Sequence, residues 1–99
     1  MVKRIAVTEA KWFDDHQETS SLIFDRAGKD TWNLSKRQLR LDGKTKEDIT
    51  PEEDREITEI SENKCCKMLG EFLNNHEGIV KGFYDKNSLE IEFLANIEA

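Results

Sequence analysis

The side chains best suited to covalent chemistry are two adjacent cysteines, Cys65 and Cys66, and two histidines, His16 and His76. A cysteine–histidine pair needs the sulfur and a ring nitrogen within hydrogen-bond reach. Cys65 and His76 fall in one predicted helix and are separated by about 16 Å along its axis, so they cannot form a dyad. No pattern in the chain brings His16 to either cysteine. We therefore expect that this protein is not an enzyme.

Metal and cofactor chemistry are not predicted either. Asp14, Asp15 and His16 offer three metal-binding groups, but consecutive side chains rarely converge on one ion. The five glycines are scattered and form no phosphate-binding loop. We expect no metal and no cofactor.

Charge is distributed unevenly along the chain. There are 15 basic and 21 acidic residues, which give a formal net charge of -6. Residues 26–46 contain seven basic and two acidic side chains, whereas residues 47–62 contain one basic and eight acidic ones. The sequence therefore predicts two surfaces of opposite sign from consecutive segments.

A long helix is predicted to position the acidic segment. Thr50 and Glu53 have the spacing of a capping box, and Pro51 occupies the first helical position. Apolar residues then recur at helical spacing, and Gly78 supplies a left-handed stop. The pattern predicts a helix over about 51–76.

Strands are predicted on both sides of this helix, from runs of β-forming residues and the turn clusters between them. Their approximate ranges are 4–8, 21–24, 31–41, 79–84 and 89–93. The segment 14–19 is expected to be a loop. The order β-β-β-α-β-β predicts an α+β domain spanning residues 1–99, with a mainly antiparallel sheet of about five strands and one long helix on one face.

Our first functional hypothesis assigns partner binding to the acidic segment. On the predicted helix, Glu52, Glu56 and Glu59 form one outward stripe, and Glu62 follows them. Such a stripe suits a larger, basic protein, including one whose groove binds nucleic-acid phosphates, so the chain would act as an inhibitor or adaptor. Small phage-encoded inhibitors of host defence share this size and charge. Plain solubility explains the stripe equally well.

The alternative hypothesis is a nucleic-acid-binding regulator that uses the basic hairpin of residues 26–46. Its cations can neutralise phosphates, and Trp32 could stack on a base. The residues assigned to this surface are Lys29, Lys36, Arg37, Arg40 and Lys44. Alternation with Leu39 and Leu41 predicts Arg40 and Lys36 on the open face of the sheet. The overall negative charge opposes this hypothesis, because it repels a polyanion at long range.

Other properties limit where the protein works and with what. No apolar run approaches the roughly 20 residues of a membrane span, and no secretory signal is visible. Adjacent cysteines cannot easily join in a disulfide, which fits the reducing cytoplasm. An uncovered sheet face or an open sheet edge would allow a homodimer. A small enzyme subunit is the third hypothesis, and no motif supports it.

Overall fold

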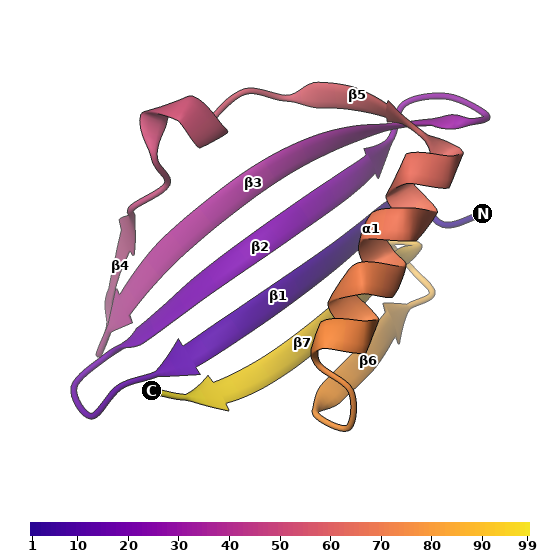
Figure 1. Ribbon diagram of the computed structural model, residues 1–99. Helices are drawn as coiled ribbons and strands as arrows, with labels where there is room; N and C mark the ends of the chain where they lie inside the picture. Colours follow the sequence, from indigo (N-terminus) through magenta and orange to yellow (C-terminus); the bar gives the residue numbers. More distant parts are fainter.

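The computed structural model describes residues 1–99 and shows an α+β fold in which seven strands form one sheet with a single α-helix on one face (Figure 1). In chain order the elements are β1 (Arg4–Trp12), β2 (Gln17–Arg26), β3 (Thr31–Asp42), β4 (Thr45–Asp48), the 3-10 helix η1 (Glu52–Asp54), β5 (Thr58–Ser61), α1 (Glu62–Asn75), β6 (Val80–Asp85) and β7 (Glu90–Glu98).

The strands are ordered β4-β3-β2-β1-β7-β6, and β5 also pairs with β3. Every pairing is antiparallel except that of β1 with β7, which is parallel. The expected mainly antiparallel sheet with one helix is confirmed. The expectation of about five strands was wrong, because β4 and β5 have only four residues each and are too short to leave an alternating pattern.

The N-terminal strands are longer than the sequence suggests. Residues 14–19 were expected to form a loop, but β2 begins at Gln17, which pairs with both Trp12 and Leu41. The start of β2 is polar, so hydropathy does not reveal it. Backbone hydrogen bonds to a neighbour on each side hold it in the sheet.

The predicted helix over about 51–76 was wrong at its N-terminal end. Residues 52–54 form a short 3-10 turn, residues 58–61 form β5, and α1 begins only at Glu62. The expected capping box at Thr50 is also absent. Ser61 is the true N-cap, and its side-chain oxygen accepts a hydrogen bond from the backbone N–H of Lys64 at 3.2 Å.

Residues 58–61 form a strand and not a helix because β3 has a free edge beside them. Ile57, Thr58 and Ile60 are β-branched, which favours extended backbone. The N-terminal half of β3 offers an unpaired edge, and β5 adds to it with Ile60 opposite Trp32. Both of these side chains are buried. Burial and strand pairing therefore outweigh the capping signal at residues 50–53.

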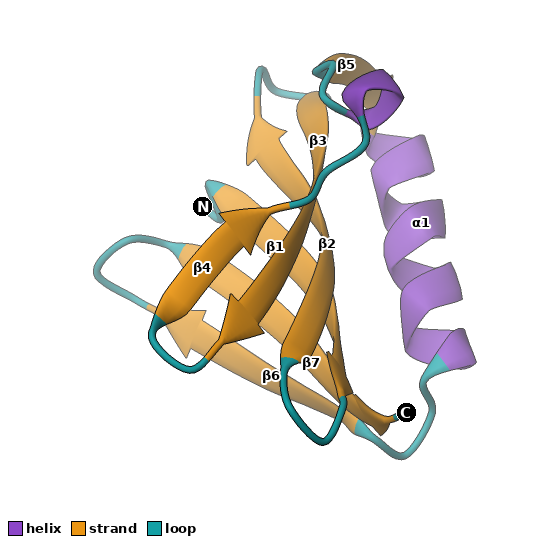
Figure 2. Ribbon diagram, turned by 90° about the vertical axis from the view of Figure 1, so that its left-hand side faces the viewer, coloured by secondary structure: helices purple, strands orange, loops and turns teal.

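The core lies between α1 and one face of the sheet, and the opposite face carries no helix (Figure 2). The predicted apolar stripe of α1 is confirmed: Cys65 is buried, and Met68, Leu69 and Phe72 pack against the core. Their partners from the sheet include the buried residues Val7, Phe24, Trp32 and Leu34. Only nine of the 99 residues are buried, because a single helix covers so little of a seven-stranded sheet.

Register assigns each side chain to one face. Lys36 pairs with Leu22 of the core, so Lys36 and Arg40 lie on the helix-bearing face. Their expected place on the open face was wrong. Leu39 occupies the open face instead, because the core residues Trp32 and Leu34 set the alternation of β3. Glu90 and Glu92 of β7 pair with Arg4 and Ala6 of β1 and lie on the open face.

The N-cap gives a direct test of where α1 starts. Replacing Ser61 by Ala removes the acceptor for the Lys64 N–H, and we expect a loss of about 1 kcal/mol in the free energy of unfolding. Ser61→Asp keeps an acceptor and should retain most of the stability. Urea denaturation measures both variants. Equal stability of S61A and the unaltered protein would contradict the cap.

Candidate functional site

Residues 50–62, here called the acidic segment, follow the outer edge of β3. Figure 1 shows the chain arching along this edge from β4 through η1 to β5 and then into α1. The segment is therefore an extended ridge at one side of the sheet. It is not the helical face that the sequence predicted.

Both ends of the acidic segment are anchored in the protein. At one end Thr50 is buried, and its hydroxyl lies 2.9 Å from the backbone N of Gln38 and 2.6 Å from Oδ1 of Asp48. The hydrogen bond from the Thr50 hydroxyl, and then that from its N–H, hold the pKa of Asp48 below its ordinary value. At the other end Ile60 is buried against Trp32. A segment held at both ends loses little conformational freedom when a partner binds.

Some of the carboxylates in the segment already have cationic neighbours. The ion pairs are Glu52 with Arg55 at 3.7 Å, Asp54 with Lys36 at 3.8 Å, and Glu62 with Arg26 at 3.7 Å. Glu53, Glu56 and Glu59 are exposed and form no ion pair. These three are the carboxylates available to a partner.

An apolar side chain stands among them. Ile57 lies between Glu56 and Glu59 and is 69% exposed, although it is a large aliphatic residue. It lines a shallow groove of about 320 Å³ between the acidic segment and the sheet, together with Arg55 and Arg37. A single exposed aliphatic side chain is common on protein surfaces. Here it shares one segment with three unpaired carboxylates, so the same surface offers apolar area and negative charge.

The predicted binding residues are therefore split by the true secondary structure. Glu56 and Glu59 remain on the surface, in a loop and on β5. Glu52 is on η1, and Glu62 is in the first turn of α1, where the helix dipole favours a carboxylate. Glu53 was missed, because the expected helix accounted for it as a first-turn residue.

The predicted basic surface is dispersed over the sheet. Lys29 lies in the β2–β3 turn and Lys44 in the β3–β4 turn, at opposite ends of the twelve-residue strand β3. Arg37 is on the open face, whereas Lys36 and Arg40 are on the helix-bearing face. Lys36 also faces Asp54 at 3.8 Å, and Arg40 faces Asp42 at 3.8 Å. Trp32, the expected stacking platform, is 1% exposed.

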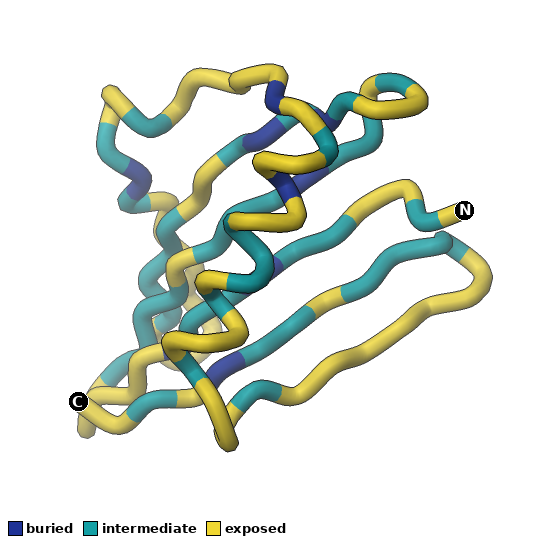
Figure 3. The backbone as a smooth tube through the Cα atoms, turned by 45° about the vertical axis from the view of Figure 1, so that its right-hand side comes forward, coloured by how far each residue is buried: buried dark blue, intermediate teal, exposed yellow.

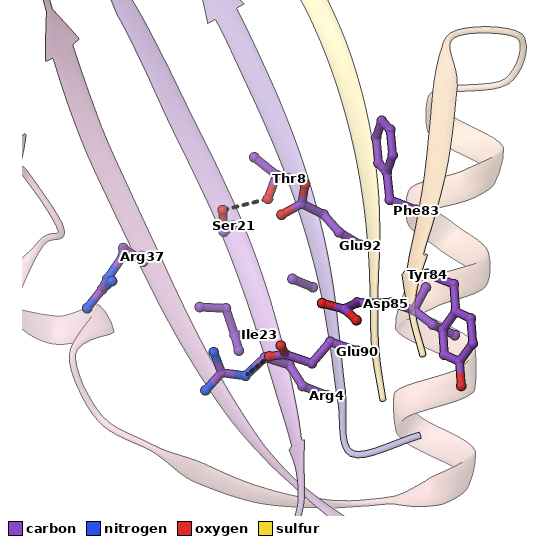
Figure 4. A pocket seen from close by; sticks show the side chains of 12 residues that line it. Arg4, Thr8, Ser21, Ile23, Arg37, Phe83, Tyr84, Asp85, Glu90 and Glu92 are labelled. Atoms are coloured by element: carbon purple, nitrogen blue, oxygen red, sulfur yellow. Dashed lines mark hydrogen bonds and ion pairs between the residues drawn. The ribbon is translucent and has the colours of Figure 1, made fainter. Parts of the chain in front are cut away.

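The open face of the sheet carries a groove of about 470 Å³ (Figure 4). Its floor is made of short side chains from β1 and β2, including Ala6 and a Thr8–Ser21 hydroxyl pair at 2.8 Å. Arg37 stands on one side and Phe83 on the other, as Figure 4 shows. Small residues at the centre and large ones at the rim make the hollow.

Charges within this groove mostly satisfy one another. Arg4 Nε lies 2.6 Å from Asp25 Oδ1 and 3.6 Å from Glu90 Oε1. The hydrogen bond to Asp25 raises the pKa of Arg4. Arg37 is the cation without a carboxylate at ion-pair distance. The hydroxyls of Thr8 and Ser21 bond each other, and Asp85, Glu90 and Glu92 are the carboxylates that line the groove with them.

The two cysteines differ in environment. Cys65 is buried in the core, Cys66 is exposed, and both are free thiols. Burial raises the pKa of Cys65 to about 11, so its thiol stays protonated. Cys65 is thus a core residue, as its place on the apolar stripe indicates.

Alkylation distinguishes these environments. We expect iodoacetamide to modify Cys66 rapidly in the folded protein and Cys65 only after unfolding in urea. Mass spectrometry counts the adducts. Rapid double alkylation under native conditions would contradict the placement of Cys65.

Both histidines contact carboxylates. His16 Nδ1 lies 2.7 Å from Asp15 and Nε2 lies 2.8 Å from Glu18, and the ring stacks on Phe13 with centroids 4.5 Å apart. These hydrogen bonds raise the pKa of His16. No group of three or more His, Cys, Asp or Glu side chains is arranged to hold a metal ion.

His76 connects the end of α1 to the sheet. Its Nδ1 lies 2.8 Å from the Phe72 carbonyl and its Nε2 lies 2.9 Å from Glu9. Burial lowers the pKa of His76, but the hydrogen bonds to Glu9 and Phe72 together outweigh burial, so the pKa is raised.

This shift predicts a pH dependence. The pKa of His76 is higher in the folded protein than in the unfolded chain. The His76–Glu9 hydrogen bond therefore adds fully to the free energy of unfolding below the ordinary histidine pKa of about 6.5. That contribution is lost as the pH rises through the raised pKa. NMR titration of the Glu9→Gln variant should show a lower pKa for His76. The pKa of His16 should not change and serves as an internal control. An unchanged His76 pKa in E9Q would contradict the contact.

The helix is too short and too polar to cross a membrane. Comparison with known proteins finds no significant match to a family model, a curated protein or a solved structure. Any function must therefore be argued from the surfaces described above.

Proposed function

We propose that this protein is a non-catalytic binding module that docks on a larger protein with a basic surface. The docking surface is the exposed part of the acidic segment, formed by Glu53, Glu56, Ile57 and Glu59. One observation carries the proposal: three exposed, unpaired carboxylates and one exposed aliphatic side chain share a ridge that is anchored at both ends.

Each part of this surface has a distinct physical role. The carboxylates steer a basic partner and fix its orientation, which mainly affects the association rate and the specificity. Ile57 supplies apolar area that leaves water on binding, worth up to about 2 kcal/mol for a side chain of this size. The buried Thr50 and Ile60 keep the ridge in one conformation before the partner arrives.

A role as inhibitor or adaptor follows from this mode of binding. An acidic ridge can occupy a groove that a partner otherwise uses for phosphates, which would make the module an inhibitor of a nucleic-acid-binding protein. The dispersed cations of β3 provide less support for direct nucleic-acid binding, because the structure does not gather them on one surface.

Charge reversal tests the proposal. The tagged protein is used to capture partners from a lysate of its native host, with and without nuclease. We expect one nuclease-resistant protein partner, and Glu53→Lys, Glu56→Lys and Glu59→Lys together should weaken its binding about a hundredfold, since like charges across an interface cost several kcal/mol.

The matched control is Glu71→Lys, Glu77→Lys and Glu98→Lys, three exposed and unpaired carboxylates outside the segment. It changes the net charge equally and should retain binding. Ile57→Ser should weaken binding at every salt concentration, because it removes no charge. A capture that nuclease abolishes, or equal losses in both triple variants, would contradict the proposal.

A further inference from the structure

The sheet ends in an uncovered strand on the side opposite the acidic segment. β6 pairs with β7 on one side and is the terminal strand of the sheet. None of the backbone hydrogen bonds outside the regular elements involves residues 80–85. Figure 3 shows this strand as an exposed run along the outer edge. Its outward N–H and C=O groups are a template for a further strand.

The side chains of β6 do not protect this edge. Residues 81–85 are all exposed, and they include two aromatic residues, Phe83 at 53% and Tyr84 at 59%. An exposed aromatic pair on a free edge strand is a characteristic of a strand-pairing surface.

Register divides these side chains between the two faces. Lys81, Phe83 and Asp85 lie opposite Leu94, Glu92 and Glu90 of β7, so they belong to the open face. Gly82 and Tyr84 lie opposite Phe93 and Ile91, on the helix-bearing face.

Two copies of the segment from Lys81 to Asp85 are complementary to each other when they run antiparallel. In an antiparallel pair centred on Phe83, Lys81 of each copy faces Asp85 of the other, and the two Phe83 rings meet at the centre. On the helix-bearing face, Tyr84 of each copy lies opposite Gly82 of the other, beside the Phe93 ring that covers Gly82 at 3.3 Å from its Cβ position. Charge pairs, aromatic pairs and aromatic residues over glycine each favour strand pairing.

We propose that β6 pairs antiparallel with β6 of a second copy of this chain, about a two-fold axis at Phe83. The contact is isologous, so it closes at two copies and does not continue into a fibre. It joins the two sheets into one and removes both free β6 edges.

The Asp85 carboxylate is already held in position at the end of β6. Its Oδ1 accepts hydrogen bonds from the N–H groups of Asn87 at 2.9 Å and Ser88 at 3.4 Å, which fix the carboxylate at the end of β6. Neither bond uses Oδ2, so that oxygen can accept from the Lys81 ammonium of the second copy.

The opposite edge of the sheet lacks these features. There β3 is already paired by β4 and β5, two four-residue strands separated by η1. These strands carry Lys46, Glu47, Asp48 and Glu59 but no aromatic side chain, and the interruption at η1 leaves only four-residue edges for another chain. Edge pairing is therefore specific to β6.

Sedimentation measures the association. An interface of one six-residue strand is at the small end of specific interfaces. We expect a reversible dimer of the 11.5 kDa chain that forms as the concentration rises from about 10 μM to 1 mM. A constant monomer mass over that range would overturn the proposal.

Two variants and a matched control identify the surface. Lys81→Glu places like charges opposite each other at two symmetric positions and should weaken dimerisation about tenfold. Phe83→Asp places two carboxylates together at the axis and should abolish the dimer. Lys67→Glu makes the same charge change on the exposed face of α1 and should have no effect. A dimer that survives both β6 variants would overturn the proposal.

Disulfide trapping tests the register in a Cys66→Ser background, where the remaining Cys65 is buried. Phe83→Cys places two cysteines directly opposite each other, within the Cα separation of about 4.4–6.8 Å that a disulfide requires. Mild oxidation should link the copies. Tyr84→Cys places its cysteines diagonally, at roughly 7–8 Å, and should not link. Efficient linkage through residue 84 and not through residue 83 would overturn the proposed axis.

Circular dichroism of each variant checks that the monomer is folded. All the substituted side chains on β6 are exposed, so the monomer should retain its stability. If a charge variant unfolds, the Phe83→Cys and Tyr84→Cys variants test the interface in its place, because disulfide formation depends on the distance between the two cysteines.

Discussion

The burial of Trp32 constrains the structure between residues 50 and 62. Trp32 is among the largest fully buried side chains, and the Arg26 guanidinium carbon lies 4.2 Å from its ring centroid. The guanidinium also donates to the carbonyls of Val2 and Lys29 at 3.0 and 3.1 Å. Ile60 of β5 pairs opposite Trp32, and Cys65 of α1 joins the same cluster. Residues 58–61 must therefore form a strand before the helix can start, and this extended strand continues the acidic ridge along the edge of β3.

The sequence predicts the parts of the fold that local patterns control. Turn clusters and alternation locate the β2–β3 and β6–β7 hairpins, and the apolar stripe from Cys65 to Phe72 locates the helix face. It does not predict what depends on long-range pairing. The Thr50–Glu53 capping signal is a genuine local preference, but β3 offered residues 58–61 a backbone partner that no local pattern contains. The parallel pairing of β1 with β7 joins residues more than 80 positions apart and leaves no local signal either.

The candidate site likewise combines features that the local sequence predicts with features that depend on long-range contacts. The distribution of charge along the chain identifies the acidic segment without a structure, because residues 47–62 contain eight carboxylates. Which of them are free depends on ion pairs such as Asp54 with Lys36, whose partner comes from a different element. The exposure of Ile57 is a similar case. At helical spacing it flanks the apolar stripe, and only the strand at 58–61 turns it to the surface.

Dimerisation through β6 would affect how the acidic segment at the other edge of the sheet binds a partner. The acidic segment lies beside β3, and β6 lies at the far end of the strand order, so a partner on one edge leaves the other free. A dimer through β6 would therefore carry two acidic ridges, separated by eleven strand spacings or roughly 50 Å along the continuous sheet. For a partner with two basic sites at matching separation, binding at the first ridge raises the effective concentration of the second. Avidity would then strengthen a surface whose individual carboxylates each contribute little, because they are exposed to water and screened by salt.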